Sequence, residues 1–448
     1  MATEAKKVVR LQTVGCRLNQ YETERMAARI YPYGFRRAET NDEQADLTII
    51  NTCTVTHRAD SDCRYLIRRA ARDNPDGHIV VVGCYVDHEP ERIAGMEGVD
   101  VIVHNSEKEQ IDRILPARLP DLFRDEPDKS CSPHIEDFHD RNRAWLKISD
   151  GCNQWCSFCI ITIVRGRLSN RPAAEIIDEI NTLVSQGYRE VVLTGINMGY
   201  YHDKQREPKI RNLAGLCRMI MENTDLPRMR LSSIEPQAVR DDLIEVYADS
   251  GGRICRHFHM PLQSAASEIL RKMRRPYNQA IYIKRVSDIK AAVPGTTIGA
   301  DVIVGFPGET DEHFDQTRRL CESGLVDYLH VFSYSDRPGT DAAGINPKVN
   351  PEIIRNRNKA LTEVSYRLHQ ENLRRQRGQL LGVIAEHKGA EDGSHFAVSD
   401  NYLKVKLPAG DYMGREIVSV RVTGIRDDYL EGIRVTVDQP VDCCPPGA

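Results

Sequence analysis

Three cysteines lie close together in the run Cys152-Asn153-Gln154-Trp155-Cys156-Ser157-Phe158-Cys159, separated by three residues and then by two. Thiolates are the usual ligands of iron–sulfur clusters, and a cubane cluster ordinarily takes four of them. No fourth cysteine follows nearby, so three irons would be held and one would stay open. An open iron can chelate the amino and carboxylate groups of S-adenosylmethionine and pass it an electron. The sulfonium then breaks and gives a 5′-deoxyadenosyl radical.

Two other interpretations of Cys152, Cys156 and Cys159 are a structural zinc loop and three unrelated core thiols. Zinc sites favour paired CxxC motifs or mixed Cys/His sets, and no such pair stands here. The spacing therefore favours a 4Fe-4S cluster that binds S-adenosylmethionine.

Three further cysteines follow predicted strands in the N-terminal part of the chain. Apolar runs at 8–14, 46–52, 78–83 and 100–103 alternate with helical stretches, which favours a parallel sheet covered on both faces. Cys16, Cys53 and Cys84 end the first three runs. Because ligands gather at the carboxyl ends of strands in open α/β sheets, we expect these thiols to meet at one edge. This predicts a second cluster with three ligands; three buried core thiols are the alternative.

The central part of the chain repeats the strand–helix pattern. Residues 116–142 are rich in proline and charge and predict a linker, and a strand at 144–148 leads into the Cys152 run. Further strands are predicted at 190–194, 229–232, 257–260, 297–304 and 328–332. This alternation predicts a partial or full (β/α) barrel, whose active site lies at the carboxyl ends of its strands.

The C-terminal part differs in pattern. A basic helix is predicted over 358–379, and short strands follow at 382–386, 402–407, 416–422 and 432–437. Regularly spaced short strands predict a small all-β barrel of OB-like kind. A barrel of this kind beside Arg374, Arg375 and Arg377 is suited to hold RNA. A solvated helix followed by a module that only stabilises the fold is the alternative.

Composition narrows the class of protein. The 448 residues are enough for about three domains, and 40% hydrophobic with 28% charged residues is ordinary for a globular protein. No apolar run approaches a membrane span, and no apolar signal core follows Met1, so we expect a cytoplasmic protein without a membrane partner. Thirteen cysteines then indicate metal or redox chemistry rather than disulfides. A net charge of −4 leaves RNA binding to local patches.

Several segments together resemble one known family, the radical-SAM methylthiotransferases, which comprises MiaB, MtaB and RimO. They are Gly15-Cys16-Arg17-Leu18-Asn19-Gln20-Tyr21-Glu22-Thr23-Glu24, Asn51-Thr52-Cys53-Thr54-Val55, Val82-Gly83-Cys84-Tyr85, the Cys152 run, Leu193-Thr194-Gly195-Ile196-Asn197 and Arg230-Leu231-Ser232-Ser233-Ile234-Glu235-Pro236. The first of them resembles the MtaB branch most closely. The resemblance covers essentially the whole chain. It implies a flavodoxin-like methylthiotransferase domain over 1–115, a linker over 116–142, a radical-SAM domain over 143–370 and a TRAM domain over 375–437.

The resemblance implies an activity and its partners. The expected reaction is methylthiolation at C2 of N6-threonylcarbamoyladenosine, position 37 of tRNA, beside the anticodon. One S-adenosylmethionine would supply the radical at the Cys152, Cys156 and Cys159 cluster, and a second would methylate sulfur held at the Cys16, Cys53 and Cys84 cluster. The expected partners are tRNA, an electron donor such as a flavodoxin or ferredoxin, and a sulfur donor. The alternatives are isopentenyladenosine in tRNA, an aspartate of a ribosomal protein, or a non-catalytic iron–sulfur sensor that binds RNA.

Strand ends and the resemblance also predict a cofactor pocket. We expect it to include Phe158, Gly195, Asn197, Ser233, Glu235, Val302, Ile303 and Gly305. Each glycine could instead serve a tight turn, and Glu235 a helix cap or a surface ion pair. Near this pocket the chain departs from the family pattern: Thr162 and Ile163 stand where relatives usually have Pro-Tyr, and Ala265 stands where glycine is common.

The remaining cysteines match no role in the family. Cys63, Cys131, Cys217, Cys255 and Cys321 are interpreted as core or surface thiols. The vicinal pair Cys443 and Cys444 could bind metal, but a flexible tail is the favoured interpretation.

Overall fold

The computed structural model describes residues 6–40, 42–128, 135, 137–139, 141–204, 210–389, 392–410, 412 and 414–435. The chain divides into two compact units. The first contains residues 1–137, 151–154 and 159–168, and the second contains 138–150, 155–158 and 169–448. The segment 159–168, which begins with the last cysteine of the Cys152 run, therefore folds as part of the N-terminal unit.

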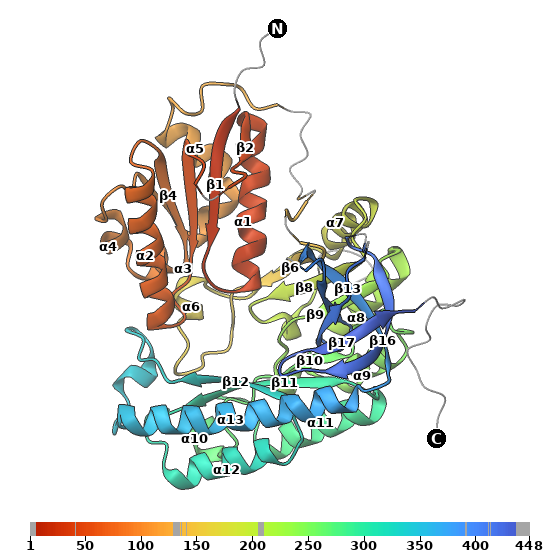
Figure 1. The fold of residues 1–448 in the computed structure, drawn as a ribbon. Helices are drawn as coiled ribbons and strands as arrows, with labels where there is room; N and C mark the ends of the chain where they lie inside the picture. The colour runs from red at the N-terminus through yellow and green to blue at the C-terminus, as the bar shows by residue number, and fades with distance from the viewer. Residues whose placement is uncertain are drawn as a thin grey trace. The chain divides into compact units, whose positions relative to one another are not determined.

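The N-terminal unit has a parallel sheet (Figure 1). Its strands are β1 (Lys7–Thr13), β2 (Phe35–Arg37), β3 (Leu47–Thr52), β4 (His78–Gly83) and β5 (Val101–Val103), and its α-helices are α1 (Arg17–Ile30), α2 (His57–Asp73), α3 (Cys84–His88), α4 (Pro90–Ala94), α5 (Ile111–Arg118) and α6 (Ile161–Val164). In the described residues the strand order is β2-β1-β3-β4-β5. This is the flavodoxin-like order, so the predicted class of the domain is confirmed.

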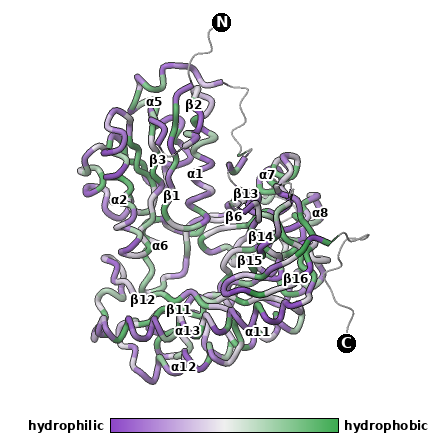
Figure 2. Tube along the Cα trace, viewed as in Figure 1, coloured by the Kyte–Doolittle hydropathy of each residue, from purple (hydrophilic) through white to green (hydrophobic). Residues whose placement is uncertain are grey.

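Both faces of this sheet are covered, as its near-continuous apolar strands predict. Every residue of β3 is buried. On one face, strand residues pack with Met26 of α1 and Leu115 of α5. On the other face, they pack with Ile67 of α2 and Ile93 of α4. Figure 2 shows the hydrophobic stretches of chain along the strands of this unit. Strand β2 was not predicted because Phe35-Arg36-Arg37 contains two charged residues and no apolar run.

Helix α5 extends into the segment that was predicted as a linker, and Pro116 lies inside it. A proline within a helix removes the N–H that the carbonyl four residues earlier would accept. Here that carbonyl belongs to Asp112, and it accepts a hydrogen bond of 2.9 Å from the Tyr33 hydroxyl instead. The replaced hydrogen bond explains why the helix continues through Pro116, at which the predicted linker begins.

The second unit contains a partial (β/α) barrel. Its strands are β6 (Ala144–Asp150), β7 (Ser169–Asn170), β8 (Glu190–Gly195), β9 (Arg228–Leu231), β10 (His257–His259), β11 (Thr297–Val304) and β12 (Tyr328–Ser333), and its helices are α7 (Ala173–Ser185), α8 (Leu213–Asn223), α9 (Asp241–Ala248), α10 (Ser267–Lys272), α11 (Gln279–Ala292) and α12 (Asp311–Glu322). Strands β6, β8 and β9 pair in parallel, as do β10, β11 and β12. Parallel bridges Met229–Ile254 and Ser233–His259 join the two sheets.

A long helix and a closed β-barrel complete the second unit. Helix α13 (Pro351–Arg375) starts earlier than the predicted 358, because the Asn350 side chain accepts a hydrogen bond of 2.8 Å from the Glu352 N–H and Pro351 stands at its first position. The described barrel strands are β13 (Leu380–Gly389), β14 (His395–Ser399), β15 (Lys404–Leu407), β16 (Ile417–Ile425) and β17 (Leu430–Arg434). They close in the order β13-β14-β15-β17-β16. The predicted small all-β barrel is confirmed; β14 was missed, and residues 436–437 lie outside the described residues.

A buried cluster of charges ties this β-barrel to the central sheet. Glu190 on β8 is fully buried and lies 2.5 Å from Arg228 Nε and 2.9 Å from Arg230 Nε. The same guanidinium groups donate to barrel carbonyls: Arg228 to Gly382 at 2.8 Å, and Arg230 to Ser399 at 2.8 Å. Burial alone would raise the pKa of Glu190, but Arg228 and Arg230 hold it well below its usual range. The carboxylate therefore stays ionised between them.

Within the described part of the chain, no helix has the length and apolar character needed to cross a membrane.

We expect Glu190→Gln to destabilise the second unit, because it leaves two buried guanidinium groups without their counter-charge. Breaking a buried ion pair by removing one partner costs about 3–5 kcal/mol. Thermal unfolding followed by circular dichroism should show a clearly lowered Tm. Glu322→Gln is the matched control: Glu322 forms solvent-exposed ion pairs with Arg318 and Arg367, and such pairs contribute about 0–1 kcal/mol. Equal Tm values for the two variants would contradict the assignment.

Candidate functional site

The carboxyl ends of β1, β3 and β4 bring three cysteines to one edge of the N-terminal sheet. Cys16 caps α1, Cys53 follows β3, and Cys84 is the first residue of α3 after β4. Burial raises the pKa of the Cys53 thiol to about 12, and negative charge on Cys16 or Cys84 would raise it further. Cys16 and Cys84 affect the pKa of Cys53 because the three thiols lie close together. Binding of a metal to such thiols must release their protons, because thiolates are the ligands.

Glycines directly before two of these cysteines permit the close approach. Gly15 has φ +107° and Gly83 has φ +105°, a region that residues with a side chain rarely adopt. A Cβ atom on Gly15 would lie 2.7 Å from Cys53 Cβ and 2.9 Å from Cys53 Sγ. A Cβ on Gly83 would lie 2.6 Å from the Thr52 carbonyl oxygen. Gly15 therefore leaves room beside the Cys53 sulfur, and Gly83 lets the chain before Cys84 pass close to the end of β3. The donor set of three thiols fits an iron–sulfur cluster.

The other three cysteines lie in the stretch between β6 and α6, and all are half-buried. The Cys152 sulfur accepts a hydrogen bond of 3.3 Å from the Gln154 N–H. The Cys156 sulfur accepts one of 3.1 Å from Arg275 Nη1. N–H groups directed at ligand sulfurs are among the features that tune iron–sulfur clusters, so these contacts suit ligands of iron.

The predicted pocket residues lie at the carboxyl ends of three barrel strands and in the Cys152 run. Gly195 ends β8 and buried Asn197 follows it; Ser233 and Glu235 follow β9; Val302 and Ile303 belong to β11, and Gly305 follows that strand; Phe158 packs with Ile303 against a core cluster around Phe306. All of them belong to the second unit. Their role in cofactor binding stays a prediction. Glu235 stands at the N-cap position of a short 3-10 helix, but its side chain makes no capping hydrogen bond and forms an ion pair with Arg275 instead.

The departures from the family pattern are accommodated locally. Ala265 is buried, and its N–H donates a hydrogen bond of 3.0 Å to Thr317 Oγ1. Thr162 and Ile163 lie within α6, where the Ile163 side chain is exposed.

The cysteines without a predicted role include one that contacts the triad of Cys16, Cys53 and Cys84. Cys63 on α2 is buried, and its sulfur lies 3.4 Å from both the N and the O of Cys53. Cys217, Cys255 and Cys321 are also buried, as expected for core thiols. Cys131, Cys443 and Cys444 lie outside the described residues.

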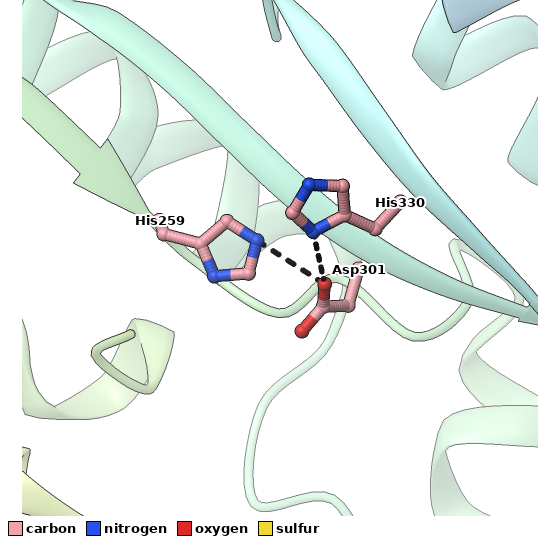
Figure 3. A group of neighbouring side chains, drawn as sticks. All are labelled: His259, Asp301 and His330. Atoms are coloured by element: carbon pink, nitrogen blue, oxygen red, sulfur yellow. Dashed lines mark hydrogen bonds and ion pairs between the residues drawn. The ribbon is translucent and has the colours of Figure 1, made fainter. Parts of the chain in front are cut away.

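A polar group on β10, β11 and β12 was missed by the sequence analysis. Figure 3 shows His259 and His330 directed at one carboxylate oxygen of Asp301. His259 Nε2 lies 3.1 Å and His330 Nδ1 lies 3.2 Å from Asp301 Oδ1. Burial would raise the pKa of Asp301, but the two histidines hold it well below its usual range. This spacing is compatible with a shared divalent cation as well as with direct polar contacts.

The face of β11 that carries Asp301 is partly exposed, whereas the opposite face is core. Ala300 and Val302, which alternate with Asp301 on β11, are completely buried. The next side chain on the face of His330 is Phe332, which is 43% exposed. The signal in the sequence was the alternation His257-Phe258-His259, but alternation alone does not indicate which strands become neighbours.

Comparisons with known proteins agree with this organisation. Residues 8–104 match the family described as "Uncharacterized protein family UPF0004", and residues 146–321 match the Radical SAM superfamily. The chain is 36% identical to the "Threonylcarbamoyladenosine tRNA methylthiotransferase MtaB" of Bacillus subtilis, over 96% of this chain and 97% of that protein. The protein of the same name from Chlamydia pneumoniae is 34% identical, over 96% and 98%. A "tRNA-2-methylthio-N(6)-dimethylallyladenosine synthase" of Clostridium tetani is 32% identical, over 95% and 96%.

Solved structures show the same fold class. The radical S-adenosylmethionine methyltransferase TsrM of Kitasatospora setae matches with a TM-score of 0.55 and 14% identity, over 73% of each chain. The cobalamin-dependent S-adenosylmethionine radical enzyme OxsB matches with a TM-score of 0.50 and 9% identity, over 80% of this chain and 56% of that one. At these identities the likeness concerns the fold alone.

We expect Gly15→Ala to weaken metal binding by Cys16, Cys53 and Cys84, because its Cβ would press against Cys53. Anaerobic reconstitution should then give about half of the iron that the unchanged chain binds, as for one of two four-iron clusters. Gly34→Ala is the control: Gly34 also has positive φ, at +82°, but its Cβ would meet only Lys7 Cε, at 3.8 Å. Full iron content in Gly15→Ala would contradict the prediction.

Proposed function

Because this chain belongs to the radical-SAM methylthiotransferase family, we propose that it adds a methylthio group to C2 of N6-threonylcarbamoyladenosine at position 37 of tRNA. The observation that carries the proposal is identity of 36% over nearly the full length of a relative with that name. The two cysteine sets and the family segments around them support this proposal. A flavodoxin or ferredoxin is the proposed electron donor.

Radical SAM enzymes use a 4Fe-4S cluster and S-adenosylmethionine, which together supply a carbon-centred radical when bound. We assign the ligands of that cluster to Cys152, Cys156 and Cys159. A second 4Fe-4S cluster on Cys16, Cys53 and Cys84 is our proposal for the place where the sulfur is held and methylated. In these assignments Gly15 leaves the space beside the Cys53 sulfur free, and the Arg275 N–H donates a hydrogen bond to the Cys156 sulfur.

The polar group of His259, Asp301 and His330 favours threonylcarbamoyladenosine over isopentenyladenosine. The threonylcarbamoyl substituent carries N–H groups, a hydroxyl and a carboxylate, whereas the isopentenyl group is a hydrocarbon. A hydrocarbon against an ionised carboxylate would desolvate it without replacing its hydrogen bonds, which costs free energy. Asp301 can accept from N–H and O–H donors, and a protonated imidazole can donate to a carboxylate. We therefore infer that this group contacts the N6 substituent.

Analysis of the reaction product tests the proposed function directly. Anaerobically reconstituted protein should convert tRNA that carries N6-threonylcarbamoyladenosine to its 2-methylthio form, seen as the mass of the added group in nucleoside digests. A deletion strain should lack that nucleoside. Conversion of only isopentenyladenosine tRNA, or of a ribosomal protein, would show that the proposed substrate is wrong, and absence of deoxyadenosine release would indicate a binding protein without catalysis.

We expect Cys53→Ala to uncouple cofactor cleavage from product formation. The variant loses a ligand of the second cluster and keeps Cys152, Cys156 and Cys159. It should still release 5′-deoxyadenosine from S-adenosylmethionine and form no methylthiolated nucleoside. Cys217→Ala is the control, since Cys217 is a buried thiol on α8. Full product formation by Cys53→Ala would show that the N-terminal cysteines are core thiols.

We expect His330→Phe to raise the KM for threonylcarbamoyladenosine tRNA about tenfold, the effect of losing roughly one hydrogen bond to a charged group. The ring is retained, so the packing of the strand is preserved. The release of deoxyadenosine without tRNA should stay unchanged. His369→Phe on α13 makes the same replacement away from this group. An unaltered KM in His330→Phe would remove the group from substrate binding.

We expect Arg374 and Arg377 to contribute to tRNA affinity. Both are exposed where α13 ends before the β-barrel, whereas Arg375 forms an ion pair with buried Asp327. The double variant Arg374→Gln/Arg377→Gln should bind tRNA more weakly, and the slope of log affinity against log salt should fall by about 1 for each lost phosphate contact. Arg318→Gln/Arg319→Gln on α12 removes the same charge elsewhere. Identical slopes for both double variants would argue that the barrel only stabilises the fold.

A further inference from the structure

We propose that Arg165 is a positioning residue of the Cys16, Cys53 and Cys84 site, where it donates a hydrogen bond to a cluster sulfur ligand and raises the reduction potential of the cluster. The inference rests on the proposed second cluster. It assigns a role to a residue that the sequence analysis did not single out, since Arg165 follows the other set of cysteines in the chain.

The contacts of Arg165 fix its guanidinium group against the triad. Its Nε lies 3.2 Å from Cys84 Sγ. Nη1 donates to Glu22 Oε1 at 2.8 Å, and Nη2 donates to Asn19 Oδ1 at 2.6 Å. The side chain is only 1% exposed. A guanidinium is a rigid fork, so holding both terminal nitrogens also fixes the direction of the Nε–H towards the sulfur.

Arg165 shares its carboxylate partner Glu22 with a second buried cation. Glu22 also accepts a contact of 2.7 Å from Lys108 Nζ, and both side chains are 4% exposed. One carboxylate between two cations gives this buried trio a formal charge of +1. Burying net charge costs free energy unless an opposite charge lies near. Thiolates and the cluster that they hold would supply that opposite charge.

The contact of Arg165 with Cys84 would act on a cluster that this sulfur holds. Hydrogen bonds to sulfur and nearby charge set cluster potentials. A buried cation that donates to a ligand sulfur favours the more negative, reduced state of the cluster and therefore raises its reduction potential.

The chain segment that delivers Arg165 is anchored in the N-terminal unit. Ile160 and Val164 pack with Cys84 in a buried cluster. The Val164 carbonyl accepts a hydrogen bond of 2.8 Å from Asn105 Nδ2, and Arg165 is the residue that ends α6. Packing of this segment therefore holds Arg165 in place beside Cys84.

A second arginine provides a natural comparison. Arg275 Nη1 donates to Cys156 Sγ at 3.1 Å, its side chain is 3% exposed, and it pairs with Glu235. In each cysteine set, a sulfur thus accepts a hydrogen bond from an arginine, and a glutamate holds that arginine in place. Arg165 should act on one cluster and Arg275 on the other.

The test measures the potential of one cluster at a time. Full-length Cys152→Ala/Cys156→Ala/Cys159→Ala protein retains only the N-terminal set, and its reduction is followed by electron paramagnetic resonance in an anaerobic redox titration. Adding Arg165→Gln should lower the midpoint potential so that the reduction equilibrium shifts tenfold or more, which is 59 mV for one electron. Arg165→Lys, which keeps the charge, should restore part of the shift. Arg275→Gln in the same background should leave the potential unchanged.

The reverse background, Cys16→Ala/Cys53→Ala/Cys84→Ala, should respond to Arg275→Gln and not to Arg165→Gln. Equal midpoint potentials with and without Arg165→Gln would overturn the role of Arg165 alone. Failure of the parent to bind iron would overturn the proposed second cluster together with it. If Arg165→Gln does not fold, Arg165→Lys decides: a lowered potential supports the role, and an unchanged potential refutes it.

Discussion

Parallel pairing of β1, β3 and β4 is the constraint on which the N-terminal site depends. The register aligns Thr13 with Asn51 and Thr52 with Gly83, so the segments that follow the three strands leave the sheet at the same level. Cysteines more than thirty residues apart in sequence then meet, and the positive-φ Gly15 keeps the space beside the Cys53 sulfur free of a side chain. A shift of one residue in this register would turn a buried strand's side chains to the opposite face and move its cysteine away from the others.

Buried charges impose a second level of order. Glu22 joins Lys108 and Arg165, and Glu190 joins Arg228 and Arg230, in both cases across large separations in sequence. Such groups contribute little net stability, because desolvation offsets their attraction. They do make incorrect arrangements costly, since each charge is compensated in only one packing. In the N-terminal unit the result is a cation fixed at a cysteine sulfur, and in the second unit it is a β-barrel fixed to the central sheet.

In the second unit, side chains that alternate along the strands separate the polar group of His259, Asp301 and His330 from the core. On β11 the buried Ala300 and Val302 form the core side, and Asp301 and Ile303 form the accessible side. The accessible side of the three neighbouring strands carries imidazole, carboxylate and aromatic groups together. This combination can bind a substituent rich in N–H and oxygen groups beside an aromatic base, which is the chemistry proposed for the substrate.

The sequence by itself determined the class of the fold and the residue types of the proposed cluster sites, because strand periodicity and the spacing of Cys152, Cys156 and Cys159 are local properties. It misjudged Pro116, since the replacement for the lost hydrogen bond comes from distant Tyr33. Only the tertiary structure decided that Arg165 lies against Cys84 and that His259, Asp301 and His330 share one point. Those contacts join segments 29 to 81 residues apart. No local pattern encodes them, because they depend on which strands and helices become neighbours.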